Sequence, residues 1–305
     1  MASRKERVLK GRGPLFVSST LLASLTIVVA LVLQIVNEPS QSRSKWPTFS
    51  TSGCAKCAHF TSKTSFQLLL GGVPRSIPSS LSYIEVDLFD TSTSDLSNFK
   101  GLASKGTILG CYIDAGTVES WRPDAKRYPN AILGKSDVGW SGERWVNVAS
   151  YDPTLAQILE ERVKLCKERG FQAVDFDNVD GYQNNTGFKI SANQQIAFDT
   201  FLANLAHHYG LLVGLKNDLE QFKTLAPSFD FAVEESCLQY QACLSQQNIA
   251  DGVDAFATAK PIFDVEYLKP TKSICYEANA SKVVTNFAQL ELATDEVSCQ
   301  SILQG

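Results

Sequence analysis

Carboxylates gather directly after two apolar runs of this sequence. The first run releases three aspartates and an amide within six residues, namely Asp175, Asp177, Asn178 and Asp180. The second run ends in an adjacent pair, Glu234 and Glu235. Carboxylates at this density repel one another unless a metal ion, a cationic ligand or a proton compensates. Two strands that each end in carboxylates provide what acid/base chemistry at the mouth of a barrel requires.

A calcium loop is the first alternative for the aspartate-rich segment. An EF-hand loop beginning at Asp175 needs glycine at its sixth position and glutamate at its twelfth, but these positions hold Asp180 and Thr186. We therefore predict no metal site here, and we expect Asp180 to cap a helix or form an Asx turn. The sequence has no P-loop, GxGxxG segment or Gly-x-Ser-x-Gly elbow, so it predicts no nucleotide cofactor and no serine hydrolase.

Eight short apolar runs must position these carboxylates. They are residues 66–70, 83–87, 107–113, 145–148, 172–177, 211–216, 231–235 and 262–267. Helical spacing of apolar residues predicts a helix over 153–169 that stops at Gly170, and a second helix over 191–208. Strands that alternate with helices predict an α/β fold, a (β/α)8 TIM-type barrel in a single domain. A doubly wound sheet is the alternative, because residues 71–82 are rich in proline and too short for a good helix.

Polar residues stand at six of the predicted strand ends, where a barrel carries its functional residues. They are Asp87, Asp90, Tyr112, Asp114, Asp175, Asp177, Lys216, Asn217, Glu234, Glu235, Glu266 and Tyr267. This density favours a functional site over an inert barrel. Simpler alternatives are a counter-ion role for Lys216 and a structural acceptor role for Asp87. His207 and His208 are expected at the C-terminal end of a helix, where the dipole favours them.

Seven sequence blocks, in the same order, resemble glycoside hydrolase family 114. They are VDLFDT from Val86, GCYIDAGTVESWRPD from Gly110, GERWVNV from Gly142, GFQAVDFDNVDGY from Gly170, GLKND from Gly214, FAVEESCLQY from Phe231 and VEY from Val265. The resemblance covers roughly residues 66–300. It implies a (β/α)8 endo-α-1,4-polygalactosaminidase that cuts cationic galactosamine-containing polysaccharides. It also places the family's strand-end aspartate at Asp177 and its glutamate at Glu235.

The sequence departs from the family pattern in four places. The first strand, at 65–69, lacks the usual tryptophans, and Phe176 replaces the usual proline. Glu234 stands where asparagine is usual, and Asp114 stands where serine is usual. These departures leave the paired carboxylates in place. They also keep a second hypothesis open, a catalytically silent, membrane-anchored carbohydrate-binding protein.

The strand ends and the resemblance together predict a two-carboxylate glycosidase. One carboxyl group donates a proton to the leaving oxygen while the other acts as nucleophile or base. We assign Asp177 as nucleophile or base and Glu235 as acid. The excess acids are expected to bind substrate ammonium groups: Asp175, Glu234 and Glu266. Aromatic residues are expected to stack on sugar faces: Tyr112, Trp121, Tyr182 and Tyr240. The other predicted substrate-binding residues are Asp87, Asp114, Asn178 and Lys216.

The net charge of the chain favours some classes of binding partner over others. The chain has 28 basic and 32 acidic residues, and because 1–13 hold five of the basic and one of the acidic residues, the remainder carries a net charge of −8. An acidic domain argues against nucleic acid as a partner, since nucleic acid binds basic faces. It suits a cationic polymer, although ordinary solubility charge explains the count equally well. We expect a preference for de-N-acetylated galactosamine stretches that weakens as salt rises.

An uncharged segment near the N-terminus predicts attachment to a membrane. Residues 15–36 carry no charge over 22 positions, which is long enough to span a bilayer as a helix. Basic flanks stay cytoplasmic, so we predict a single-pass type II protein. Its parts are a cytoplasmic tail (1–13), an uncleaved signal-anchor (14–36), a linker or stem (37–64) and a lumenal or extracellular hydrolase domain (65–305).

Eight cysteines in an exported chain predict disulfides. We expect one disulfide between Cys237 and Cys243, beside Glu235, and one between Cys275 and Cys299. For Cys111 and Cys166, pairing and free thiols both stay open. The segment Cys54-x-x-Cys57-x-His59 lacks a second ligand pair, so a local disulfide or free thiols are favoured over zinc. Sequons for N-glycosylation at Asn184 and Asn279 agree with export.

Overall fold

The computed structural model describes residues 45–47, 54, 57–60, 65–73, 77–78, 80–243, 253–293 and 296–305. All of these residues belong to one compact unit, Ser44–Gly305. The predicted cytoplasmic tail and signal-anchor lie outside the described residues, as does most of the predicted linker. Across the described ranges, no helix is long and apolar enough to cross a membrane.

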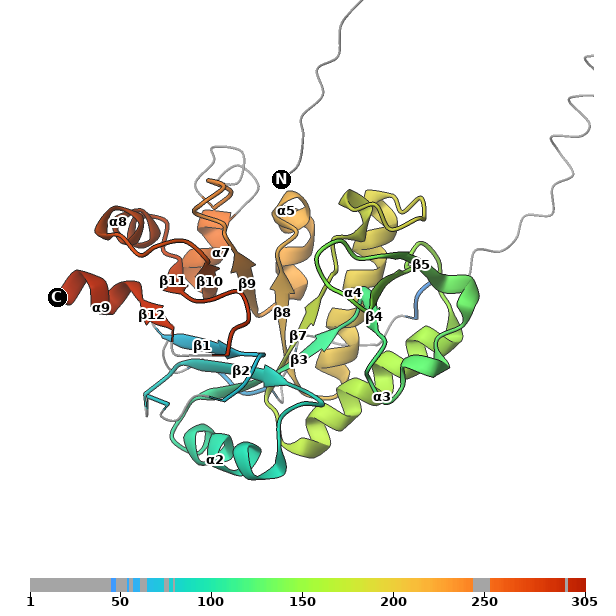
Figure 1. Cartoon of the computed structure of the whole chain (residues 1–305), viewed down its shortest axis with the longest axis horizontal. Helices are drawn as coiled ribbons and strands as arrows, with labels where there is room; N and C mark the ends of the chain where they lie inside the picture. The colour runs from blue at the N-terminus through green and yellow to red at the C-terminus, as the bar shows by residue number, and fades with distance from the viewer. Residues whose placement is uncertain are drawn as a thin grey trace, which may run out of the picture. The chain divides into compact units, whose positions relative to one another are not determined.

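A curled, mostly parallel sheet is the frame of this unit (Figure 1). Within the described residues its nine strands follow the order β1 (Phe66–Leu69), β2 (Tyr83–Asp87), β3 (Ile108–Asp114), β7 (Ala173–Asp177), β8 (Leu212–Lys216), β9 (Phe231–Glu235), β10 (Ile262–Glu266), β11 (Val284–Phe287) and β12 (Val297–Ser298). Neighbours from β1 to β11 pair in parallel, and β12 pairs antiparallel with β11. The Asn286 side chain on β11 donates to the Phe66 carbonyl on β1 at 2.8 Å. This curled α/β sheet is TIM-like.

One predicted strand lies in a different sheet, and one strand was missed. The segment 145–148 was expected in the barrel, but it overlaps β6 (Glu143–Val146), which pairs antiparallel between β4 (Thr117–Glu119) and β5 (Leu133–Ser136). The parallel strand that completes the series is β11, whose sequence VTNF has two polar residues between two apolar ones. A segment of four residues carries no information on its pairing partner, so the sequence could not separate these two segments.

The helices follow the strands and cover the outer face of the sheet (Figure 1). In the described ranges they are α2 (Thr93–Ala103), α3 (Pro153–Arg169), α4 (Ala192–His208), α5 (Phe222–Leu225), α7 (Val253–Ala259), α8 (Lys272–Ala280) and α9 (Cys299–Gln304). Short 3-10 turns are η1 (Ala125–Arg127), η2 (Asn130–Ile132), η3 (Gly181–Gln183), η4 (Leu219–Gln221) and η5 (Ala226–Ser228).

The two long helices begin and end where local chemistry predicts. Asp152 caps α3 by accepting from the backbone N–H groups of the first turn, and Gly170 ends it in the left-handed conformation at φ 88°. Ser191 and Gln194 form a capping box at the start of α4. The sequence predictions for both helices are confirmed.

Aromatic rings fill the inside of the curled sheet. Phe66, Tyr83, Phe231 and Phe263 come from four different strands and are buried together. The rings of Tyr83 and Phe263 stack with their centroids 5.1 Å apart. Gly110 leaves the space for this packing, because a Cβ atom there would lie 2.1 Å from the Tyr83 hydroxyl. The rings form a solid base below the strand ends.

Part of the segment predicted as a linker packs against this unit. Trp46 is buried, donates from its indole to the Val148 carbonyl at 3.3 Å, and stacks on Phe201. Phe60 lies with its ring centroid 5.8 Å from that of Phe231. The compact unit, which begins at Ser44, therefore includes residues ahead of the predicted boundary at 65.

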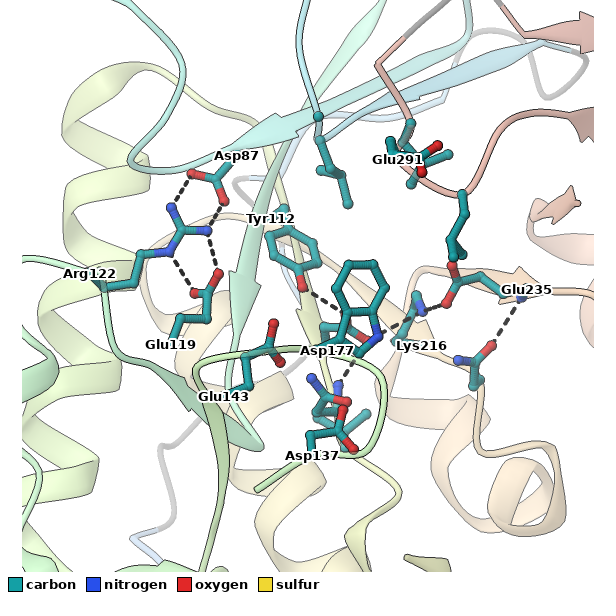
Figure 2. Close-up of a pocket in the computed structure, with 18 of the residues that line it drawn as sticks. Asp87, Tyr112, Glu119, Arg122, Asp137, Glu143, Asp177, Lys216, Glu235 and Glu291 are labelled. Atoms are coloured by element: carbon teal, nitrogen blue, oxygen red, sulfur yellow. Dashed lines mark hydrogen bonds and ion pairs between the residues drawn. The ribbon is translucent and has the colours of Figure 1, made fainter. Parts of the chain in front are cut away.

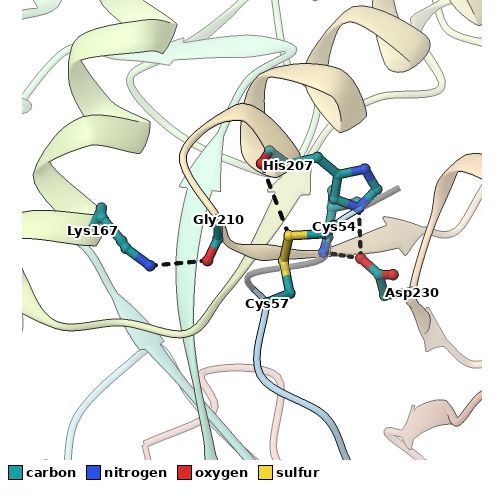
Figure 3. The surroundings of a disulfide bond; sticks show 7 residues. Cys54, Cys57, Lys167, His207, Gly210 and Asp230 are labelled. Carbon is teal, nitrogen blue, oxygen red and sulfur yellow. Dashed lines mark hydrogen bonds and ion pairs between the residues drawn. A yellow bond between two sulfur atoms is a disulfide. The ribbon is translucent and has the colours of Figure 1, made fainter. Parts of the chain in front are cut away.

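Cys54 and Cys57 form a local disulfide near the C-terminal end of α4 (Figure 3). The sulfur of Cys54 lies 3.9 Å from the carbonyl oxygen of His207. The His207 ring lies in the last turn of α4, as expected, and forms a 2.8 Å hydrogen bond with Asp230. The local disulfide is confirmed, and the zinc alternative is not supported because both sulfurs are bonded.

Three further disulfides connect the frame. Cys237–Cys243 and Cys275–Cys299 form as predicted. Cys111 on β3 and Cys166 on α3 are bonded to each other, which decides the pair that the sequence left open. This bond links the sheet directly to a helix on its outer face.

Loss of the Cys111–Cys166 disulfide is expected to destabilise the domain more than loss of Cys237–Cys243. The sequence separations are 55 and 6 residues, for which loop-closure entropy gives contributions of about 4 and about 2 kcal/mol. Urea unfolding of the two double Cys→Ala variants measures the difference. Equal unfolding free energies would show that the longer loop adds no constraint.

Candidate active site

A pocket of about 430 Å³ lies at the C-terminal ends of the parallel strands (Figure 2). It is lined by Leu70, Gly71, Asp87, Asp90, Tyr112, Glu119, Trp121, Arg122, Asp137, Trp140, Glu143, Trp145, Asp177, Asn178, Val179, Asp180, Asn184, Lys216, Asn217, Glu235, Leu290, Glu291 and Leu292. This is the face on which TIM-type barrels carry their sites. Seven sequence-predicted residues are among these: Asp87, Tyr112, Trp121, Asn178, Lys216, Asp177 and Glu235.

Lys216 joins the two carboxylates that the sequence analysis selected. It ends β8, between Asp177 at the end of β7 and Glu235 at the end of β9. Its Nζ atom lies 3.3 Å from Oδ1 of Asp177 and contacts Oε2 of Glu235. The Tyr267 hydroxyl donates to Oε1 of Glu235. A single ammonium group therefore lies between the two carboxylates.

Asp177 and Lys216 each stabilise the charged form of the other. Burial by itself raises the pKa of Asp177, but the Lys216 ammonium, the Tyr112 hydroxyl and the Asn178 backbone N–H together hold this pKa below its ordinary value. Tyr112 donates to Asp177 Oδ2 at 2.7 Å, and Asn178 N–H donates to Oδ1 at 2.8 Å. Burial lowers the pKa of Lys216, but the carboxylates of Asp177 and Glu235 outweigh it and raise this pKa well above its ordinary value. Asp177 is thus an anion at neutral pH.

The chain turns sharply directly after each of these three strands. Asn178, Asn217 and Ser236 have φ angles of 59°, 51° and 57°, in the left-handed region that non-glycine residues seldom adopt. The Asn217 side chain accepts from the backbone N–H of Glu235 at 3.0 Å, which connects two of the turns. Strained backbone of this kind clusters at functional sites, where surrounding contacts hold it. The three turns aim the strand-end side chains into the pocket.

Arg122 forms one wall of the pocket, and the sequence analysis did not select it. Its guanidinium is buried and pairs with Asp87 at 2.5 Å, Asp90 at 2.9 Å and Glu119 at 2.6 Å. It also lies 6.0 Å from the ring centroid of Trp121, whose indole is half exposed. Asp87 is therefore both a pocket residue and a structural acceptor, which is the simpler role the sequence offered. The fixed guanidinium supports Trp121 at the pocket edge.

The small antiparallel sheet provides a second wall, which adjoins that of Arg122 because Glu119 on β4 pairs with Glu143 on β6. Glu143 begins β6, Trp145 follows on the same strand, and Asp137 and Trp140 lie in the hairpin before it. These positions were missed because the segment was expected inside the barrel. A signal was present, since Glu143 and Trp145 lie within the GERWVNV block.

Two predicted ammonium-binding acids point away from the pocket. Successive side chains of a strand face opposite sides of a sheet, so Glu234 faces away from the side on which Glu235 lies. It is buried, and burial followed by the charge of Asp264 raises its pKa. Glu266 also lies outside the pocket, where it accepts from the backbone N–H groups of Leu238 and Gln239 at 2.7 and 3.1 Å. Glu266 holds the turn after β9.

Four further predicted residues do not line the pocket. Asp175 is completely buried inside the sheet below it, where both carboxylate oxygens lack a hydrogen-bond partner among the described residues, and burial and then Glu85 raise its pKa. Asp114 accepts from Thr117 N–H at 2.8 Å and so holds the turn between β3 and β4. Tyr182 donates to Asp218 at 2.8 Å. Tyr240 is 74% exposed on the surface.

No set of three His, Cys, Asp or Glu side chains is arranged to hold a metal ion in the part of the chain that the structure describes. The Asp180 carboxylate, in the former calcium-loop segment, instead accepts from the Asn184 side chain at 3.0 Å.

A TIM-like α/β fold with two carboxylates at nearby strand ends is the arrangement that glycosidases use. The family model for glycoside-hydrolase family GH114 matches residues 47–304, and the chain belongs to this family. It is similar to Ega3 of Aspergillus fumigatus, solved in complex with galactosamine, at 29% identity and a TM-score of 0.68, over 78% of this chain and 95% of that one. No curated protein matches the chain.

A second similar structure is the glycoside hydrolase domain of PelA from Pseudomonas aeruginosa. It has 15% identity and a TM-score of 0.57, over 77% of this chain and 98% of that one. At this identity the likeness shows the fold alone. The family match confirms the sequence-based resemblance to the family.

Proposed function

We propose that this glycosidase hydrolyses α-1,4-linked galactosamine-containing polysaccharide by a two-carboxylate mechanism. The observation that carries the proposal is the contact of one buried ammonium, that of Lys216, with both Asp177 and Glu235 in the pocket. Glycosidic cleavage needs two carboxyl groups held on either side of the scissile bond. The similarity to Ega3, which was solved with galactosamine, supports this class of substrate.

Asp177 acts as the nucleophile and Glu235 as the acid and base. The depressed pKa of Asp177 keeps this carboxylate ionised and ready to attack the anomeric carbon. Because both groups contact the same ammonium, their nearest oxygens lie closer than the roughly 6.5–9.5 Å found when a water molecule must fit between carboxyl groups. This spacing supports a mechanism that retains the anomeric configuration, through a covalent glycosyl intermediate at Asp177.

The balance of charge in the pocket suits a cationic polymer. Two basic residues and nine acidic residues line it, and the chain after residue 13 has a net charge of −8. An acidic cleft concentrates positively charged substrate near the site and accelerates its approach. Half-exposed aromatic rings at the edge, those of Trp121 and Trp140, provide stacking surfaces for sugar units.

Incubation of the purified full-length chain with a de-N-acetylated galactosamine polymer tests the function. We expect new reducing ends, and we expect proton NMR of the earliest products to show the α-anomer of the substrate linkage. A β-anomer as the first product would contradict the retaining mechanism. Binding of the polymer without any release of reducing ends would favour the catalytically silent carbohydrate-binding alternative.

We further propose that residues 14–36 anchor the protein with its hydrolase domain in the lumen or outside the cell. The basic tail before an uncharged segment of 22 residues supports this orientation. The exposed sequon residues Asn184 and Asn279 are compatible with it. In intact microsomes, added protease should spare the C-terminal domain and remove only the short N-terminal tail. Digestion of the C-terminal domain in sealed vesicles would reverse the topology.

A further inference from the structure

The pocket contains carboxyl groups that no basic residue of the described chain neutralises. Its two cations are already occupied, because Arg122 pairs with Asp87, Asp90 and Glu119, and Lys216 pairs with the two catalytic carboxylates. Four lining acids have no ion-pair partner among the described residues: Asp137, Glu143, Asp180 and Glu291. Unpaired carboxylates are costly where they are shielded from water. No further cation is available to them among the described residues, whereas a cationic substrate brings one.

Glu143 is the most deeply buried of these four acids. It is 8% exposed, yet its side chain lines the pocket and points toward the space in front of Tyr112 and Asp177 (Figure 2). One oxygen, Oε2, accepts from the Thr117 hydroxyl at 3.1 Å. The other oxygen accepts no hydrogen bond from the described residues. A buried carboxyl group with one anchored and one open oxygen is suited to receive a donor from a ligand.

We propose that Glu143, assisted by Asp137, binds the ammonium group of an amino-sugar unit and so selects de-N-acetylated substrate. This assignment rests on the proposed function. It replaces Asp175, Glu234 and Glu266, which the structure places away from the pocket, as the ammonium-binding acids. An ammonium gives the open oxygen of Glu143 a charge-assisted hydrogen bond. An N-acetyl group offers only a neutral amide and adds bulk against this wall.

Asp137 is placed to share the charge. It lies in the hairpin that precedes Glu143, and its backbone N–H donates to the Glu143 carbonyl at 3.1 Å. Asp137 directly follows β5 and Glu143 begins β6, so both acids lie at the same end of this hairpin and line the pocket. An ammonium bound to Glu143 would lie beside a second negative charge.

Several carboxyl groups lie close to Glu143, so we expect the affinity for an ammonium group to depend on pH. Burial and the nearby charges of Glu119 on β4, Asp177 on β7 and Asp137 raise its pKa to about 7, while the Thr117 hydroxyl lowers it. Asp114 on β3 faces the same hydroxyl. Below about pH 7 the free site therefore holds a proton on Glu143. Binding an ammonium favours the ionised form, so the proton is released, and affinity rises as the pH rises toward 7.

Binding measurements on a chain that does not turn over test this inference. In the Glu235→Gln background, calorimetry compares one galactosamine oligosaccharide with the same oligosaccharide after chemical N-acetylation. We expect tighter binding of the free-amine form, and we expect Glu143→Gln to weaken that form roughly 10- to 100-fold, as for loss of a charge-assisted hydrogen bond. Binding of the acetylated form should change little. Glu277→Gln, the same change at an exposed position on α8, is the matched control.

Proton release distinguishes direct binding by Glu143 from a purely structural role, because a structural role would not change the number of protons released. At pH 6, titrations in buffers of different ionisation enthalpy should show protons released by the parent on binding the free-amine form, and none released by Glu143→Gln. Glu143→Asp keeps a carboxyl group and should keep part of the release, which preserves the test if Glu143→Gln does not fold. Equal weakening of both oligosaccharides, or unchanged proton release, would overturn the inference. Failure of the wild-type chain to hydrolyse the polymer would instead reject the proposed function and leave this binding result standing.

Discussion

Replacement of Asp177 by asparagine, or of Glu235 by glutamine, is expected to lower polymer hydrolysis by about 10²–10⁴-fold or more. The asparagine variant would lack the charge that attacks the anomeric carbon, and the glutamine variant would have no proton to donate. Both changes keep nearly the same side-chain shape. Each one leaves Lys216 a remaining partner, since this lysine contacts both carboxylates. The fold should therefore persist in both variants.

The two replacements are expected to differ in their response to the leaving group. A substrate whose leaving group departs without protonation does not need the acid for the first step. With an activated aryl glycoside, Glu235→Gln should recover a large part of the first-step rate and show a burst, whereas Asp177→Asn should not. Glu220→Gln, at an exposed position outside the pocket, controls for the substitution itself. Near wild-type polymer hydrolysis by either folded variant would remove its residue from the mechanism.

Loss of the positive charge at Lys216 is expected to affect both activity and stability. In Lys216→Met, the carboxylates of Asp177 and Glu235 face each other without a counter-ion. Removing one partner of such a buried pair costs about 3 kcal/mol or more of stability. The pKa of Asp177 should rise, because Lys216 is the main group that lowers it. Hydrolysis should fall by at least about 10²-fold, since the nucleophile is then partly protonated and misplaced.

The stability loss in Lys216→Met should depend on pH in a defined direction. A depressed carboxylate pKa contributes stability that is present above the unfolded-state pKa, near 4, and is lost as the pH falls through the lower folded-state value. The difference from wild type should therefore be largest near neutral pH and shrink below about pH 4. Urea unfolding at pH 7 and pH 3 measures it, and Lys216→Arg, which keeps the charge, is the control. A difference that stays constant with pH would assign the loss to packing.

Local patterns in the sequence were sufficient for the elements that build the frame. The helix at 153–169 was predicted from apolar spacing and its stop at Gly170, and the structure has it with the same bounds. The strands that carry Asp177, Lys216 and Glu235 end where their apolar runs end. Such features depend on neighbours within a few positions along the chain, where steric and capping preferences act. The sequence also identified the family that the comparison with known families shows.

The second wall of the pocket depended on tertiary pairing. The apolar segment after Glu143 looks like any other short strand, and only its antiparallel pairing with β4 and β5 places Glu143 and Trp145 in the same pocket as Asp177 and Glu235. Two partners of Arg122, Asp87 and Asp90, lie 35 and 32 positions away from it in the chain. Contacts of this range follow from the assembled fold, and no local periodicity encodes them.

The adjacent pair Glu234 and Glu235 shows most clearly what the sequence determines and what the tertiary structure decides. The sequence by itself determined that a strand ends in two carboxylates, and the alternation of side chains requires them to face opposite sides of the sheet. Which one faces the pocket depends on how β9 pairs with β8 and β10. The tertiary structure directs Glu235 to Lys216 and buries Glu234 on the other side. A shift of one residue in pairing would exchange them, so composition and spacing alone could not decide between the two.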